Sequence, residues 1–190
     1  MSRFFWVRHG PTHAKAMVGW TDLPADLSDT ALLGRVRDHL PDNALIISSD
    51  LVRAVDTATA ITGDRHRLPH DPALREINFG AWEMKRYHEI DDQDHARAYW
   101  EQPGDIHPPQ GESWNQVRAR VDGAVDRLLA QYPGRDFVAV AHFGVILTQV
   151  QKALNIPATR AFSHKIDNLS VTEIRLSDGQ WQAASINHLP

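Results

Sequence analysis

The sequence predicts an α/β protein, a three-layer α/β/α sandwich with a largely parallel sheet and a helical flap insertion. Short runs of almost wholly apolar residues alternate with longer stretches whose apolar residues recur at helical spacing. Strands that are apolar on both faces are typical of parallel sheets covered by helices. The length of 190 residues favours one domain, and we expect residues 1–190 to form it.

The chain opens with a predicted strand and helix. Residues 4–7 form a short aromatic run that ends in a β-branched residue, which indicates a buried strand. Residues 28–40 carry apolar side chains at helical spacing, and Pro41 follows them. Because proline cannot continue a helix, we expect this helix to end there.

A second strand and helix follow. Residues 44–47 are all apolar and predict another buried strand. The next helix should run as far as Ile61, with Gly63 just beyond its end. Ser49 or Asp50 is the expected N-cap, since short polar side chains accept the first free N–H groups of a helix.

The middle of the chain differs in composition. Residues 83–112 are acidic, rich in histidine and aromatic side chains, and closed by a Pro-Pro-Gln-Gly loop. We interpret them as a helical flap inserted between two units of the sandwich. Ser113 and Gln116 have the spacing of a capping box, which predicts the start of a long helix.

The last part of the chain predicts a strand, a helix and a hairpin. Residues 137–141 are a third buried strand, and a helix should follow as far as Leu154. Apolar and polar residues alternate along 169–176 and 181–186, which predicts two strands. Asp178-Gly179 between them is a strong turn signal. These segments complete the sandwich.

Composition excludes several classes of function. The net charge of −4 provides no basic field for nucleic acid or an anionic membrane. The absence of cysteine excludes disulfides, thiolate catalysis and cysteine-bound zinc. No apolar run is long enough for a signal-peptide core or a membrane span. We therefore expect a cytoplasmic protein that binds neither nucleic acid nor membrane, and the oligomeric state, a homodimer included, stays open.

Polar residues that make little sense as packing follow all three predicted parallel strands. Arg8 and His9 end the first strand, residues 48–50 end the second with Arg53 one turn later, and His142 ends the third. Ligands in open α/β sheets bind beyond these carboxyl ends. Arginine forks match phosphate oxygens, and an anion would offset the unfavourable position of Arg53 in the first turn of a helix. The pattern predicts a pocket for a small molecule with a dianionic, tetrahedral group.

The same residues indicate phosphoryl transfer to histidine. An imidazole attacks phosphorus only when neutral, and the charges of Arg8 and Arg53 should lower the pKa of His9. The leaving alkoxide needs a proton, for which Glu76 is the best candidate if its pKa is raised. Other carboxyl groups could serve instead: Asp50, Glu83 and Glu112.

At these positions the chain resembles the histidine phosphatase superfamily, the phosphoglycerate mutase-like clan. Matching segments occur in the family's order and cover the chain up to about residue 145. They are Val7-Arg8-His9-Gly10 with Thr12, Ser48 to Ala54 with Thr57-Ala58, Leu74-Arg75-Glu76 with Phe79 to Glu83, Gly111-Glu112-Ser113, and Ala141-His142-Phe143-Gly144. Arg-His-Gly alone is weak evidence, whereas the ordered set is strong.

The resemblance implies a role for each matched residue. His9 would be the phosphorylated nucleophile, with Arg8, Arg53 and His142 forming the phosphate pocket and Glu76 donating the proton. It implies a metal-independent phosphoric monoester hydrolase without a cofactor. The flap corresponds to the family's variable insertion, which would face the substrate and govern specificity.

Two positions depart from the family pattern near the pocket. Pro11 stands where the family often has Glu or Gln. Lys15 stands near the position at which the family often has an Asn that helps to bind the phosphate. Thr12 keeps the expected residue type. We expect Thr12 and Lys15 to contact the substrate, with Lys15 pairing either with phosphate or with a second anionic group.

Within the clan, the segment 79–84 resembles broad-specificity phosphatases and α-ribazole phosphatase. True mutases usually carry Glu-Arg-His-Tyr-Gly where this chain has Glu-Ile-Asn-Phe-Gly at 76–80. We therefore predict a phosphatase, with a phosphoglycerate mutase and a non-catalytic phospho-ligand binder as alternatives. A histidine-rich metal protein ranks last, because no convincing His-x-x-His or His-x-x-x-His pair occurs on a helix.

Overall fold

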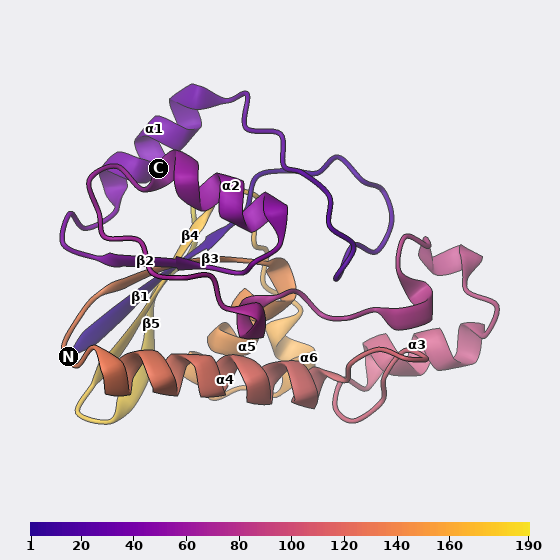
Figure 1. Cartoon of the computed structure of the whole chain (residues 1–190). Helices are drawn as coiled ribbons and strands as arrows, with labels where there is room; N and C mark the ends of the chain where they lie inside the picture. The colour runs from indigo at the N-terminus through magenta and orange to yellow at the C-terminus, as the bar shows by residue number, and fades with distance from the viewer.

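The computed structural model describes residues 1–190 and contains a five-stranded sheet in the order β2-β3-β1-β4-β5 (Figure 1). The strands β1 (Ser2–Arg8), β2 (Leu45–Ser48) and β3 (Phe137–Ala141) are parallel to one another. The hairpin of β4 (Val171–Ser177) and β5 (Gln180–His188) adds antiparallel strands beside β1. The predicted α/β sandwich is confirmed. Its sheet is mixed rather than largely parallel, because the C-terminal hairpin supplies two of its strands.

Helices cover both faces of the sheet, as Figure 1 shows. The helices α1 (Thr30–His39) and α2 (Val52–Ile61) cover one face. The helices α4 (Trp114–Gln131), α5 (Phe143–Leu154) and the short α6 (Ala158–Ala161) cover the other. The sequence signals predicted all of these helices except α6.

The alternation of side chains along β1 explains the two hydrophobic cores. Phe4 and Trp6 belong to the larger core under α4 and α5, whereas Phe5 and Val7 belong to the smaller core under α1 and α2. Successive side chains of a strand point to opposite faces, so one continuous apolar run supplies both cores. This burial of both faces fixes β1 at the centre of the sandwich.

The start of α2 differs from the prediction. Neither Ser49 nor Asp50 is its N-cap, because the helix begins at Val52 and Leu51 takes the cap position without a side-chain bond. The Ser49 hydroxyl accepts a hydrogen bond from Leu51 N at 3.1 Å, one residue too early to cap the helix. The N–H of Val52 instead donates to Asp22 Oδ1 at 2.8 Å, so a distant loop satisfies this helix end.

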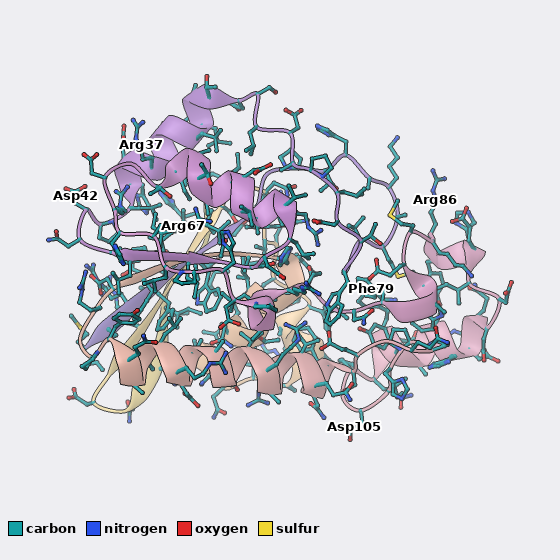
Figure 2. The ribbon with its side chains drawn as sticks, viewed as in Figure 1. Arg37, Asp42, Arg67, Phe79, Arg86 and Asp105 are labelled. Carbon is teal, nitrogen blue, oxygen red and sulfur yellow. The ribbon has the colours of Figure 1, made fainter.

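The insertion at 83–112 is helical, as predicted, and contains α3 (Gln93–Glu101). Figure 1 shows α3 beyond the first residues of α4, away from the sheet. Tyr99 packs the flap against its base: it is buried and lies edge-on to Trp82 with ring centroids 5.5 Å apart. Tyr87, by contrast, is exposed. In Figure 2, Phe79 lies where the flap joins the sandwich.

Other predicted elements are confirmed by their bonds. Ser113 and Gln116 form the capping box at the start of α4. The turn at Asp178-Gly179 has positive φ at both residues, as a tight hairpin between β4 and β5 requires. No helix of the structure combines the length and the apolar character needed to cross a bilayer.

Candidate active site

The carboxyl ends of the three parallel strands meet at one edge of the sheet, where they bring His9 and His142 together. β3 lies between β1 and β2, so its neighbours on both sides contribute residues to the same place. His9 N donates to Ala141 O at 3.1 Å. The imidazole rings of His9 and His142 then lie with their centroids 5.0 Å apart.

A cavity of about 130 Å³ opens at this edge. Pockets that hold drug-sized ligands usually measure about 300–1,000 Å³, so this one is small. Five of the residues predicted for the site line it, together with three small apolar residues: Arg8, His9, Thr12, Ala14, Ala16, Val18, Arg53 and Glu76. His142 is fully buried next to His9.

The backbone around His9 is held tightly. His9 Nδ1 lies 2.6 Å from the carbonyl oxygen of Gly10, and because a carbonyl can only accept, the proton lies on Nδ1 and the lone pair on Nε2. Gly10 N donates to Thr57 Oγ1 at 3.0 Å, and Asn168 Nδ2 donates to His9 O at 2.8 Å. A Cβ on Gly10 would lie 2.6 Å from the Leu27 side chain and 3.0 Å from Asp26 O, so Leu27 would have to move to admit one.

His9 is kept neutral by its surroundings. Burial lowers its pKa to about 3, with the charges of Arg53 and then Arg8 acting in the same direction, against the contact with Gly10 O. The arginines have the predicted effect, although burial is the larger cause. The imidazole is therefore unprotonated near neutral pH, and its Nε2 lone pair is available to a phosphorus atom.

Arg53 in the first turn of α2 is almost completely buried. Its Nη1 donates to Thr21 O at 2.9 Å and its Nη2 to Gly19 O at 2.6 Å. These bonds fix the plane of the guanidinium and leave its other N–H groups free for a ligand. Burial lowers the pKa of Arg53 from its usual value, which reflects the loss of water around the charge.

Arg8 and His142 carry buried polar atoms without partners. Arg8 Nη1 donates to Ile166 O at 2.6 Å, but its Nε has no hydrogen-bond partner. Both ring nitrogens of His142 also lack one, and its pKa lies well below the usual value because of burial first and then the charges of His9 and Arg53. Buried polar atoms are rarely unpaired, so these are the groups that a bound anion would satisfy.

Glu76 is the carboxyl group that lines the cavity. Gly144 N donates to its two oxygens at 3.0 and 3.1 Å, and Ile77 N donates to Oε1 at 3.0 Å. Its pKa is nevertheless raised, because burial outweighs these bonds and the charges of Arg53 and Arg8. A raised pKa favours the protonated form that a general acid needs.

The other candidate acids are engaged elsewhere and do not line the cavity. Asp50 forms a two-bond ion pair with Arg75, with N–O distances of 2.7 and 2.6 Å, and its pKa is lowered chiefly by this bond. Glu112 accepts from Arg120 at 2.8 and 2.9 Å. Arg75 thus favours the ionised form of Asp50, which makes it a poor proton donor.

Arg120 was not predicted from the sequence, yet it holds the segment that carries Glu76. From α4 it donates to the carbonyl oxygens of Ala73, Arg75 and Glu76 at 2.9, 2.7 and 2.8 Å. No sequence signal distinguishes it, since arginine is common on the exposed face of a helix.

Glu83 is also engaged, and its position was not foreseen. Its carboxylate accepts from Gly19 N at 3.0 Å, Trp20 N at 2.7 Å and Thr21 Oγ1 at 2.8 Å. The carbonyl oxygens of Gly19 and Thr21 are the ones that bind Arg53. Glu83 therefore orders the segment that orders Arg53.

The structure places Lys15 outside the lining of the cavity. Ala14 and Ala16 line the cavity, but Lys15 between them is exposed and does not. The segment is irregular backbone, with a bend at Ala16, so no regular period sets the direction of Lys15. Thr12, the other predicted contact, lies in the lining.

Nowhere do three or more His, Cys, Asp or Glu side chains gather in a way that could hold a metal ion. The site thus presents a neutral histidine, two arginines, an unpartnered histidine and a carboxyl group with a raised pKa around one small cavity. This set can bind a phosphoryl group, accept it on nitrogen and protonate a leaving oxygen.

Comparison with known proteins agrees with this chemistry. Adenosylcobalamin/α-ribazole phosphatase of Salmonella typhimurium is 27% identical over 97% of this chain and 90% of its own length. Bifunctional protein Rv2228c of Mycobacterium tuberculosis is 30% identical over 98% of this chain. That match covers 54% of the mycobacterial protein, so this chain spans about half the length of the first curated relatives it matches.

Solved structures share the fold throughout. The structure of Bacillus stearothermophilus YhfR superposes with a TM-score of 0.87 at 27% identity, covering 97% of this chain and 96% of the other. The resemblance inferred from the motifs is confirmed by a family model that matches residues 4–189. The chain belongs to the histidine phosphatase superfamily (branch 1).

Proposed function

We propose that this chain hydrolyses phosphate monoesters of small metabolites, without a metal or cofactor, through a phosphohistidine intermediate on Nε2 of His9. One observation carries the proposal. The neutral His9 ring, oriented by its bond to Gly10 O, lines the same small cavity as two arginines and a carboxyl group that favours its protonated form.

In the first step, His9 Nε2 attacks phosphorus and the ester P–O bond breaks. Arg8, Arg53 and His142 hold the phosphoryl oxygens, and the two guanidinium groups balance their charge. Glu76 gives its proton to the leaving alkoxide, which departs as an alcohol. In the second step the ionised Glu76 takes a proton from water, whose oxygen attacks phosphorus and releases inorganic phosphate from His9.

Phosphate release from p-nitrophenyl phosphate tests this proposal, measured with EDTA from about pH 5 to 8 for the natural chain and His9→Ala. We expect hydrolysis by the natural chain and none by a folded His9→Ala variant. His66→Ala is the matched control, since His66 is exposed and remote from the cavity lining. Full activity of His9→Ala would refute the role of His9.

Intact-protein mass spectrometry after rapid acid-free quenching should find one added phosphoryl group that is lost in acid. A phosphoglycerate mutase would instead need a bisphosphate primer and return the phosphoryl group to a second hydroxyl. Release of isomerised ester with little inorganic phosphate would favour the mutase. Phosphate binding without turnover of either kind would favour a non-catalytic binder.

The remaining proposals concern the whole chain. We propose that residues 1–190 fold as one domain in which 83–112 faces the substrate, that it works in the cytoplasm, and that it binds no nucleic acid. The lack of cysteine and the net charge of −4 support these proposals. Light scattering after gel filtration would decide between a monomer and a homodimer.

A further inference from the structure

The positive charges that line the cavity equal the negative charge of one phosphate dianion. Arg8 and Arg53 are the only lysine or arginine residues in the lining. Two guanidinium charges balance a phosphate dianion, and burial raises the pKa of Glu76, which favours its neutral form before the reaction. No further positive charge remains in the cavity for a second anion.

The wall beside the phosphate-binding groups is apolar. Ala14, Ala16 and Val18 contribute it, and all three are small. The orientation of this segment is fixed by backbone bonds to the flap. Met17 N donates to Lys85 O at 3.0 Å, and Met84 N donates to Met17 O at 2.8 Å. These two bonds join the segment to the flap at Met17, between Ala16 and Val18.

Nearby basic side chains lie outside the lining of the cavity. Lys15 is exposed, and neither it nor Lys85 lines the cavity. Arg86 is exposed on the rim of the flap, where its side chain points away from the sandwich (Figure 2). A negative group bound against Ala16 would therefore lose its water without gaining a cation.

A second anion would also meet Glu76. When Glu76 has given its proton to the leaving oxygen it carries a negative charge, and a carboxylate on the departing alcohol would repel it at close range. A hydroxyl or methylene group in the same place incurs neither cost. Both the wall and the general acid thus favour an uncharged alcohol.

We propose that this site selects phosphate monoesters whose alcohol is compact and uncharged, and discriminates against esters that carry a carboxylate or second phosphate near the first. The proposal rests on the proposed function and narrows its substrate class. It also argues against phosphoglycerate mutase activity, since both the primer and the substrate of that reaction carry a second anion.

Glycerol 3-phosphate and 3-phosphoglycerate form a matched pair for the test, because they differ by a hydroxymethyl group against a carboxylate. Each is measured as a competitive inhibitor of p-nitrophenyl phosphate hydrolysis and, where it turns over, by kcat/KM. We expect glycerol 3-phosphate to be favoured by about tenfold or more, the size typical of an uncompensated charge in a partly closed site. Equal values, or a preference for 3-phosphoglycerate, would overturn the proposal.

If p-nitrophenyl phosphate is not hydrolysed at all, the proposed function fails, and calorimetric binding of the same two esters still tests the selectivity. Ala16→Lys should narrow the preference because it brings a cation to the wall, whereas Ala16→Met, similar in length but uncharged, should not. An unchanged preference in a folded Ala16→Lys variant would contradict the proposal. Lys15→Ala should also leave the preference for glycerol 3-phosphate unchanged. A stronger preference in this variant would show that Lys15 binds the carboxylate of 3-phosphoglycerate, which would refute the proposal.

Discussion

Glu83 holds Arg53 in place without touching it, because the two side chains bind the same segment through different backbone groups. Glu83 accepts hydrogen bonds from N–H groups of residues 19–21, and Arg53 donates to the carbonyl oxygens of Gly19 and Thr21. The carboxylate comes from the flap and the arginine from α2, so the segment joins the flap to the arginine that lines the cavity.

Glu83→Gln should therefore weaken catalysis through Arg53. We expect KM to rise and kcat/KM to fall about tenfold to a hundredfold, since small displacements of a positioning group are costly. The acid limb of kcat/KM should also move to higher pH, because the charge of Arg53 helps to lower the pKa of His9.

Glu89→Gln is the control, as Glu89 accepts only from Arg86 N at 2.7 Å within the flap. If Glu83→Gln is less stable but its acid limb does not shift, then Glu83 only stabilises the fold and does not position Arg53.

The pH dependence of the free enzyme follows from two perturbed groups. His9 must be neutral and has a pKa of about 3, so kcat/KM should rise as the pH increases through that value. Glu76 must be protonated and its pKa is raised, so kcat/KM should fall as the pH increases through a value above that of an ordinary glutamate. The expected profile is a bell whose basic limb lies above the pKa of an ordinary glutamate.

Glu76→Gln should remove the basic limb and reduce kcat/KM, which reports transfer to His9 and not the later hydrolysis, about 10²–10⁴-fold for an alkyl phosphate. The loss should be much smaller for p-nitrophenyl phosphate, whose leaving group needs no proton. Equal losses for the two esters would mean that Glu76 is not the proton donor.

Gly144→Ala should also impair proton transfer from Glu76, because Gly144 contacts the Glu76 carboxyl group. A Cβ at this position would lie 2.5 Å from Glu76 Oε1 and 2.9 Å from the Ile77 side chain, so the carboxyl group must move. We expect kcat for an alkyl phosphate to fall about tenfold or more. Gly123→Ala in α4 is the control, because nothing but Arg127 lies near its added Cβ, at 3.6 Å.

The control variant should be as active as the natural chain and slightly more stable, since alanine favours a helix over glycine by about 1 kcal/mol. Normal turnover of alkyl phosphates by Gly144→Ala would contradict the proposed contact between Gly144 and the acid.

Arg65 should matter for stability and not for catalysis. It is buried and donates to the carbonyl oxygens of Arg37, Leu40 and Pro41 at 2.9, 2.6 and 2.8 Å. Arg37 lies in the last turn of α1, and Leu40 and Pro41 follow the helix. Arg65→Met removes a donor from all three carbonyls and leaves Leu40 O without one, whereas Arg37 O and Pro41 O keep backbone donors. We expect the free energy of unfolding in urea to fall by about 2–4 kcal/mol.

Arg65 also lies 3.6 Å from Asp42, whose side chain is fully exposed. Asp42→Asn should change stability by less than about 0.5 kcal/mol, because exposed ion pairs contribute little. In Figure 2, Asp42 and Arg37 lie at the end of the molecule away from the flap, so kcat/KM of both variants should stay unchanged. A small effect of Arg65→Met on unfolding would refute the capping role.

The sequence alone determined where the chemistry lies. The apolar runs that end in His9 and His142 predict strands, and strands that are parallel must bring their carboxyl ends to one edge. Patterns of period 2 and 3.6 are local, so they are legible in one chain. Arg53 and Glu76 were predicted for the same reason, from short motifs with fixed neighbours.

Only the tertiary structure decided how the site is closed and held. The outward turn of Lys15, the bonds of Glu83 and the support of Glu76 by Arg120 depend on contacts between residues that are 44 to 64 positions apart or on irregular backbone. Irregular segments have no period from which a side chain's direction can be predicted. Their direction is set by whichever distant groups satisfy their backbone N–H and C=O groups, and these partners exist only once the chain has folded.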